Sequence, residues 1–516
     1  ISNIDPKNIQ NKERIDLSDK FSYMFKSWNG DNSPILPLLQ IEENKDNSIH
    51  LWLHTNAIAE RLDLNSKKSL EGFFDKSESF PLLNTWQNYL GEKLINASKF
   101  NLGEKNEAIS LRIHLNQNNE IIDWSFHLTT VKCSFIVEDK HIEGLLTRKS
   151  KTRITSRVLK PIKEYIEDLD KILKIAIDFR KEQLSKGKIE ILKPFNNIDS
   201  LNELCIHNPS DYSKEYLEPL NYKDCQTYLS PILYEANLIS FNLTFQFNLK
   251  SASYIPKNLD YINVSEIIKY SELLESNFDL NEDGNLTLKQ VVDLCNDDKK
   301  KKILHKILLN VLRENEVVIL SPDSVINDLE KGYISPWTMP SYDFINLINQ
   351  YNIYNMIING KRSSKNNSKI VDLMKKDSWK KVNWNIYNAS ITKNMDLLFN
   401  NFTIEKVNDY KNKAKQYKAN MKSIKQVRKA EKLIENIYSG FITSVQSYGF
   451  FVLIDELNVE GLVHVSTLNN DWYEYRSRQS MLIGRKSKKS YKIGDNIEIK
   501  IIKVDILKYQ IDLELT

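Results

Sequence analysis

The side chains best suited to chemistry in this chain are aromatic and basic residues near its carboxyl end. Tyr448 and Phe451 flank a glycine and a further aromatic residue, Phe450. Small barrels stack the bases of single strands on exposed rings, at about 1–3 kcal/mol per base, beside basic side chains. This pattern predicts binding of single-stranded nucleic acid. A cluster of cations follows, made of Arg485, Lys486, Lys488 and Lys489. It either contacts phosphates or forms a solvated loop.

Short alternating strands must position these residues. From Ile437 to Thr516 the pattern is one of strands with glycines at the bends, which is typical of a small closed barrel. We expect Phe450 in the barrel core and Tyr448 and Phe451 exposed. Residues 404–433 contain few breakers and many lysines, which predicts a helix. That helix is either a phosphate track leading to the barrel or a solvated surface.

The rest of the chain predicts a mixed α+β fold. Residues 108–113 and 124–128 alternate as strands around an Asn-rich turn. Apolar positions spaced for helices occur over 158–186, 223–246 and 286–313.

Composition gives a weaker guide. The chain has 516 residues, a net charge of +4 and 27% charged residues, which suits a globular protein of two to four domains. Its 4 cysteines show no paired spacing, which indicates neither a disulfide framework nor a zinc site. No apolar run is long enough to span a membrane and no signal peptide is evident. We expect a cytoplasmic protein.

One acidic segment imitates a calcium loop. Asp279, Asn281, Asp283 and Gly284 fit an EF-hand, but Gln290 stands where a bidentate glutamate is needed. We interpret the segment as a turn and helix start, and predict no metal there.

The carboxyl-terminal segment resembles the RNA-binding OB domain of the S-one type. Five elements agree in order and spacing: Gly440–Val445, Tyr448–Val452, Gly461–Ser466, Tyr491–Asp495 and Ile501–Asp505. The insert from Asp471 to Arg485 resembles that of the S-one domains in ribonuclease II family (RNB) nucleases. The resemblance implies an RNA-contacting face made of Phe441, Tyr448, Phe451, His464, Asp505 and Lys508. His464 has turn bracing as its alternative role. Arg485 is predicted to contact RNA as part of the local basic cluster.

Upstream segments resemble the RNB nuclease domain itself. Leu38–Glu42 and Leu51–Thr55 match the back half of its acidic strand and the strand that follows, and Arg14–Ser18 matches its lead-in. Active members hold magnesium with a D-x(5)-D-x-D-D pattern. Residues without a carboxylate, Trp28, Pro34, Leu36 and Pro37, stand at those four positions here. Divalent metal needs anionic oxygens, so the resemblance implies a degenerate site.

Two further motifs are altered. Tyr333–Leu347 resembles T-S-P-[IL]-R-R-Y-x-D-L, with Tyr342 and Asp343 in place of the arginines that suit a bidentate grip on phosphate. An aspartate there is expected to repel phosphate. Ser230–Asn237 resembles a family helix without its leading acids. Phe74 falls near a tyrosine that stacks on the RNA end in the family, with core packing as the alternative.

Together the resemblances predict a lead-in segment (1–27), a degenerate RNB-like domain (28–400), a basic helical connector (401–433) and an S-one type OB domain (434–516). The leading hypothesis is an RNA-binding pseudo-exoribonuclease that binds single-stranded RNA, with no cofactor and with a possible protein partner. The first alternative is a mispaired strand that hides a diverged but active magnesium-dependent 3′-to-5′ exoribonuclease, in which Asp16 or Asp31 supplies an acid. The second alternative is a protein-interaction scaffold.

Overall fold

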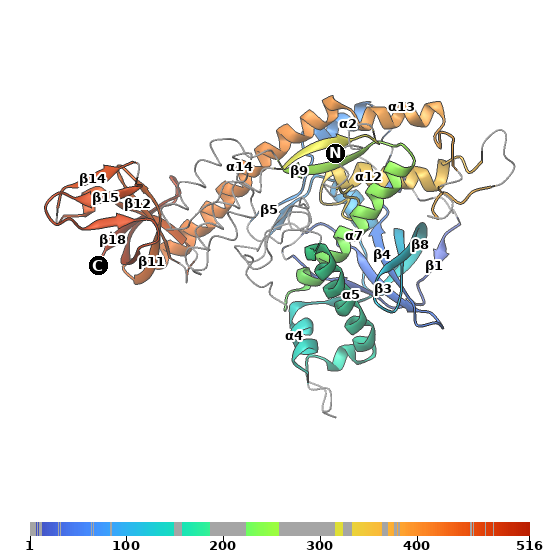
Figure 1. Ribbon diagram of the computed structural model, residues 1–516, viewed down its shortest axis with the longest axis horizontal. Helices are drawn as coiled ribbons and strands as arrows, with labels where there is room; N and C mark the ends of the chain where they lie inside the picture. The colour runs from blue at the N-terminus through green and yellow to red at the C-terminus, as the bar shows by residue number, and fades with distance from the viewer. Residues whose placement is uncertain are drawn as a thin grey trace.

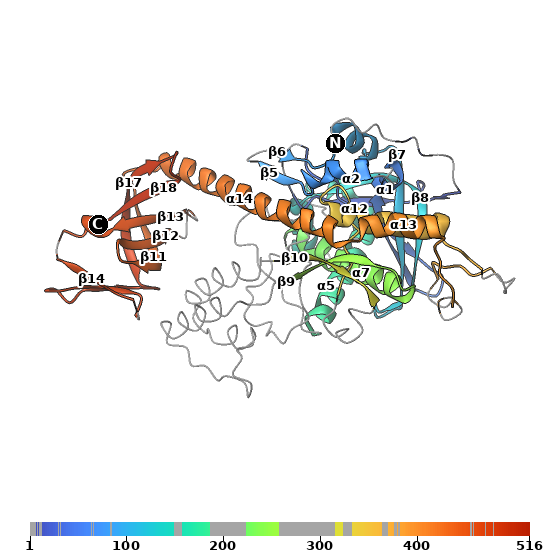
Figure 2. The same ribbon diagram turned by 90° about the horizontal axis from the view of Figure 1, so that it is seen from above.

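The large domain is built around one sheet, and the barrel domain lies apart from it at the far end of a long helix (Figures 1 and 2). The computed structural model of residues 1–516 describes residues 7, 9, 13–28, 30, 32–62, 64, 67–82, 85–148, 157–185, 223–256, 315–322, 333–363, 370–375, 379, 382–454, 457, 459–469, 471–477 and 479–516. The expected helix at 286–313 and the acidic loop at 279–290 lie outside the described residues.

Six strands form the sheet of the large domain, in the order β1-β8-β2-β3-β4-β7. The long strand β8 pairs with β7 along its first part and with β2 along its last part. The strands are β1 (Ile15–Asp16), β2 (Ser22–Phe25), β3 (Leu38–Glu43), β4 (Ile49–Asn56), β7 (Lys105–Leu115) and β8 (Ile121–Val137). Because β1 and β2 pair within this sheet, the predicted lead-in segment is corrected: residues 15–25 belong to the large domain.

The β7–β8 hairpin confirms the strands predicted from alternation. Asn119 in its turn has a φ of 62°, a conformation that asparagine tolerates better than most residues. Alternation also gives the sheet two different faces. Leu39, Leu53 and Leu111 share one row and are fully buried. The adjacent row, on the opposite face, contains Gln40 and Trp52.

Three helices cover the apolar side of the sheet and supply much of the core. These are α5 (Ile166–Ser185), α7 (Cys225–Gln246) and α12 (Phe344–Asn359). The helices predicted over 158–186 and 223–246 are thereby confirmed, although the first begins with a 3-10 turn, η1 (Lys160–Tyr165). The other described elements of the large domain are α1 (Ile58–Arg61), α2 (Lys67–Phe74), β5 (Phe80–Leu82), β6 (Thr85–Gln87), α3 (Glu92–Ser98), α4 (Asp139–Thr147), β9 (Ser251–Pro256), β10 (Asn315–Leu320) and α13 (Ala389–Leu398).

The predicted helical connector is α14 (Asn401–Glu431), a helix of 31 residues. The Asn400 side chain caps it by accepting the Thr403 N–H at 2.9 Å. The helix contributes to both cores, since Ile404 packs into the large domain and Val427 into the barrel. It therefore joins the two domains as a packed element.

The carboxyl-terminal domain confirms the expected closed barrel. Its strands are β11 (Ile437–Gln446), β12 (Gly449–Ile454), β13 (Val459–His464), β17 (Asn496–Asp505) and β18 (Gln510–Leu515). The insert forms a separate three-stranded sheet of β14 (Tyr473–Arg476), β15 (Met481–Gly484) and β16 (Ser490–Lys492). Gly449 has a φ of +154°, and a Cβ there would lie 2.2 Å from the Val463 carbonyl oxygen, so the close pairing of β12 and β13 needs glycine. Among the described residues, no helix combines the length and the hydropathy that a bilayer crossing needs.

Candidate functional site

Substituted positions from two separate motifs lie together in the large domain. The Trp28 ring stacks at 5.9 Å from that of Tyr342 and lies 5.2 Å from that of Trp86. Its Nε1 donates to the Pro34 carbonyl oxygen at 2.9 Å. Trp28 is only 3% exposed, so the position predicted to lack its acid belongs to an apolar cluster.

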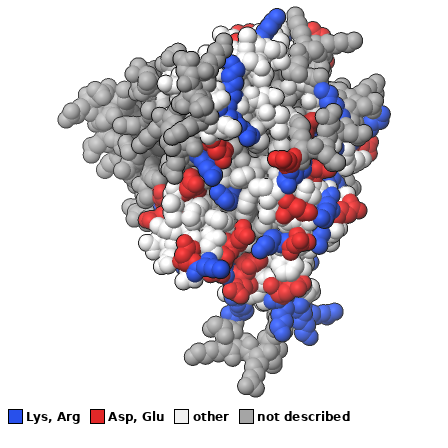
Figure 3. Space-filling view, turned by 90° about the vertical axis from the view of Figure 1, so that its right-hand side faces the viewer, with Lys and Arg blue, Asp and Glu red and all other residues white. Residues whose placement is uncertain are grey.

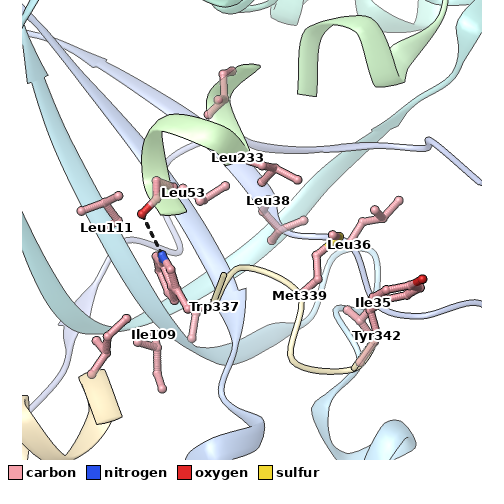
Figure 4. Close-up of a cluster of buried hydrophobic side chains, with 14 of the residues drawn as sticks. Ile35, Leu36, Leu38, Leu53, Ile109, Leu111, Leu233, Trp337, Met339 and Tyr342 are labelled. Carbon is pink, nitrogen blue, oxygen red and sulfur yellow. Dashed lines mark hydrogen bonds between the residues drawn. The ribbon is translucent and has the colours of Figure 1, made fainter. Parts of the chain in front are cut away.

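The neighbouring positions continue that cluster (Figure 4). Leu36 is buried beside Met339, and Pro34 and Pro37 are also buried. Trp337 lies on the Leu111 and Ile109 side of the cluster, is fully buried, and meets the Phe126 ring at 5.1 Å. These side chains offer no anionic oxygen.

Retained parts of the α7 motif hold Trp337 in place. The Trp337 Nε1 donates to the Ala236 carbonyl oxygen at 3.0 Å, and its backbone N–H donates to Asn237 Oδ1 at 3.2 Å. The Ala236–Asn237 part of α7 thus has a structural role.

The chain segment around Tyr342 is fixed by its backbone. The Ile35 N–H donates to Ser341 Oγ at 2.8 Å, and the Ser79 N–H donates to the Tyr342 carbonyl oxygen at 2.7 Å. The Tyr89 hydroxyl donates to the Pro340 and Asp343 carbonyl oxygens. Tyr342 is 5% exposed, so its side chain is packed within the protein.

Asp343 corrects the expectation of phosphate repulsion, because its side chain is buried and committed to α12. Its Oδ1 accepts the Asn346 N–H at 2.8 Å as the helix N-cap, and Oδ2 accepts the Tyr254 hydroxyl at 2.5 Å. Burial raises the pKa of this carboxyl above its ordinary value, although the hydrogen bonds oppose the shift. The residue stabilises a helix start and does not face solvent.

Replacing Asp343 tests this structural role. Asp343→Ala removes the cap and leaves the Tyr254 hydroxyl unpaired, so we expect a loss of about 2–4 kcal/mol in the free energy of unfolding. Asp343→Asn, the matched control, should lose less. Because the pKa is raised in the folded state, the Asp343 contribution should weaken as pH rises through the unfolded-state value near about 4. Urea unfolding between pH 4 and 8 checks this; equal pH slopes for wild type and Asp343→Asn would contradict it.

The described residues do not fit a divalent metal centre at this place. Among them no group of three or more His, Cys, Asp or Glu side chains is placed to hold a metal ion. Asp16 is exposed, pairs with Lys105 at 3.0 Å and has its pKa lowered by hydrogen bonds from Ser18 and Lys105. Asp31 lies outside the described residues.

The barrel presents the predicted aromatic pair. Tyr448 is 46% exposed and meets the half-buried Phe451 ring edge to face at 6.4 Å, whereas Phe450 is fully buried in the core. His464 is exposed, and its Nδ1 accepts the Ser466 N–H at 3.2 Å. It therefore braces the turn into η5 (Val465–Thr467) while its side chain stays accessible.

The other residues predicted to contact RNA in the barrel differ in exposure and in role. Phe441 is only 6% exposed and packs in the barrel core, which corrects its assignment to the RNA-contacting face. Asp505 Oδ1 accepts the backbone N–H groups of Leu507 and Lys508 at 3.0 Å, so this carboxylate shapes the β17–β18 turn. Lys508 is exposed beside Leu507 in that turn.

Arg485 belongs to a rigid basic turn on the insert. Asp471 Oδ2 accepts the N–H groups of Lys486 at 2.9 Å and Ser487 at 2.6 Å, and the pKa of Asp471 falls to about 2 because of the bonds from Ser487. Trp472 was not among the predicted site residues. Its side chain is 72% exposed, and its backbone carbonyl oxygen accepts the Arg485 N–H at 2.9 Å. Its exposure depends on the insert fold and leaves no mark in the sequence.

Phe74 lies in neither cluster. It is half-buried at the end of α2, and its ring meets that of Phe402 on α14 edge to face at 5.8 Å. The end of the large domain seen in Figure 3 carries interspersed basic and acidic side chains. That face offers no single-sign field that would attract a polyanion.

Comparisons with known proteins agree with this architecture. The RNB domain model matches residues 14–359, and the S1 RNA binding domain model matches residues 432–515. Because the first match covers more than half of the chain, the chain belongs to the RNB family, and it ends in an S1 RNA binding domain.

Individual relatives differ in how much of this chain they match, and the chain spans only part of each of them. The acetazolamide conferring resistance protein zam of Synechocystis is 31% identical over 214 residues, which is 41% of this chain and 27% of that protein. Mycoplasma genitalium RNase R in complex with ribose methylated single-stranded RNA has a TM-score of 0.71 at 16% identity, over 98% of this chain and 72% of that one. Yeast Ssd1, described as a pseudonuclease, has a TM-score of 0.60 at 13% identity, over 93% of this chain and 54% of that one. These two structures show the shared fold alone.

Proposed function

We propose that this protein binds single-stranded RNA through its barrel domain and does not cleave it, as a pseudo-exoribonuclease in RNA metabolism. The observation that carries the proposal is the apolar cluster of Trp28, Leu36 and Tyr342 where the family places charged groups. A phosphodiester-cleaving centre of this family needs carboxylates to hold metal and cations to hold phosphate. Buried tryptophan, leucine and tyrosine side chains supply neither.

Features of the barrel support the binding half of the proposal. The exposed Tyr448 ring offers a stacking surface. The turn from Arg485 to Lys489 offers cations on a backbone that Asp471 holds through hydrogen bonds. Single-strand binding by such domains combines stacking with phosphate contacts and weakens as salt rises. Free, buried thiols at Cys133 and Cys225 support the further proposal of a reducing, cytoplasmic setting.

The test uses the whole chain and a 5′-labelled single-stranded RNA with a free 3′ end. Fluorescence anisotropy should show binding whose log Kd rises linearly with log salt, with a slope of about 0.7 per phosphate contacted. The same mixture with magnesium, run on a denaturing gel, should show RNA of unchanged length. Shortening that depends on magnesium would support an active exoribonuclease, and absence of binding at low salt would support a protein-interaction scaffold.

A further inference from the structure

One exposed face of α14 carries aromatic and basic side chains in a line. Phe402 is 53% exposed and Tyr417 is 52% exposed, and the exposed Lys406 and Lys413 lie between them. Steps of four, eleven and fifteen residues fall close to whole turns of a helix, so these side chains share one face. At 1.5 Å per residue the line is about 22 Å long. We call Phe402, Lys406, Lys413 and Tyr417 the α14 stripe.

Packing of the two domains does not explain the stripe. Ile404 and Val407 turn into the core of the large domain, and Val427 and Ala430 turn into the barrel core. Ile404, Val407 and Ala430 lie at other angles around the helix than the stripe does, whereas Val427 lies on the same side, ten residues beyond Tyr417, where the barrel begins to cover the helix. The stripe is therefore a surface that the two cores leave exposed.

Rings from the large domain support both ends of the stripe. Phe80 on β5 stacks on Tyr417 at 6.1 Å with an interplanar angle of 16°, and Phe74 on α2 meets Phe402 edge to face. Supported rings lose little conformational entropy when a further ring stacks on them. The Phe402 and Tyr417 rings are thus held in place for stacking. Phe74 supports the Phe402 ring.

Lys406 and Lys413 favour a ligand that carries negative charge. Lys406 Nζ lies 5.6 Å from the centre of the Phe402 ring, so a cation and a stacking surface are adjacent. Alternating rings and cations suit bases joined by phosphates. An apolar protein segment would instead have to bury or desolvate the lysines. The exposed Glu405 and Asp409 are the nearby opposing charges on this part of the helix.

We propose that the α14 stripe is a second binding surface for single-stranded RNA, next to the barrel. The inference rests on the proposed function, because the barrel must first bind the single-stranded RNA. Helix α14 joins the barrel to the large domain (Figure 2), and it touches β5 and α2 along the way. An RNA strand that extends from the barrel along α14 would reach Tyr417 first and Phe402 last.

Two RNA lengths separate the stripe from the barrel. An oligonucleotide of about 8 nucleotides fits a single OB domain, whereas one of about 25 nucleotides extends beyond it. Wild-type protein should bind the longer RNA more tightly. Phe402→Ala with Tyr417→Ala, or Lys406→Gln with Lys413→Gln, should weaken binding of the longer RNA about tenfold and leave the shorter one unchanged. Phe21→Ala and Lys99→Gln are matched controls at exposed positions of the large domain.

A gain of affinity gives an independent arm. Asp409→Lys adds a cation beside the stripe, so it should tighten binding of the longer RNA several-fold at low salt. Equal affinities of all stripe variants for the longer RNA, or equal losses on both RNAs, would overturn the inference while the proposed function stands. If neither RNA binds wild-type protein, the proposed function itself fails.

Discussion

Leu36→Asp should destabilise this protein by about 3–5 kcal/mol at neutral pH, and magnesium should not restore the loss. The substitution returns an acid to a position where active RNB nucleases carry one. Leu36 is 4% exposed and lies beside Met339 in the core. A carboxylate there would be desolvated without a partner, which costs much of the stability that domains possess.

Comparison of three variants isolates the charge. Leu36→Met keeps the volume and should cost less than about 1.5 kcal/mol. Leu36→Asn adds a neutral polar group and should fall between Met and Asp at pH 7. Because burial raises a carboxyl pKa, the Asp variant should approach the Asn variant as pH falls toward about 4. Urea unfolding with and without magnesium provides the measurement. Stabilisation of Leu36→Asp by magnesium, or new nuclease activity, would show that the cluster is a poised metal site.

The second large effect concerns the barrel. Tyr448→Ala should weaken binding of single-stranded RNA by about 1–3 kcal/mol, which is roughly 5- to 150-fold in Kd. The ring is exposed and meets Phe451 edge to face, so its removal takes away a stacking surface without opening the core. Phe451→Ala should act in the same direction, with some loss of stability because Phe451 is half-buried.

Two comparisons make that result specific. Tyr448→Phe keeps the ring and should bind nearly as wild type does, since stacking needs no hydroxyl. Phe21→Ala removes an aromatic ring that is 43% exposed on the large domain, and it should leave RNA binding unchanged. Anisotropy at two salt concentrations measures all four proteins. If Tyr448→Ala binds as tightly as Phe21→Ala does, the stacking surface lies elsewhere.

Sequence reasoning worked where the chemistry was local. Alternation defined β7 and β8, and the Asn-rich turn between them provided a residue that adopts positive φ. Lysines without breakers defined α14. Strand and glycine order defined the barrel because the close approach at Gly449 excludes other residues. For the hairpin and for α14 the signal and the structure depend on neighbouring residues of the chain, whereas the approach at Gly449 is to Val463 on the next strand.

Sequence reasoning failed where exposure decides a role. Phe441 and Tyr448 are both aromatic, yet one fills the core and the other faces solvent. Asp343 was expected to repel phosphate, but its buried carboxyl caps α12 and accepts the Tyr254 hydroxyl. The cap is a local contact with Asn346, but the Tyr254 partner of Asp343 and the burial of Phe441 depend on residues far apart in sequence, which no local pattern reveals.

The sequence by itself determined that anionic oxygens are missing from the family's acidic strand, because residue type fixes which atoms can ligate a metal. Together with the S-one resemblance, it also indicated the order of the barrel elements along the chain and the lysine-rich helix before them. Only the tertiary structure decided that Trp28 and Tyr342 stack on one another, and that Phe402 and Tyr417 form an exposed line backed by Phe74 and Phe80. Burial and contact arise from packing between distant segments, and packing is a property of the folded chain.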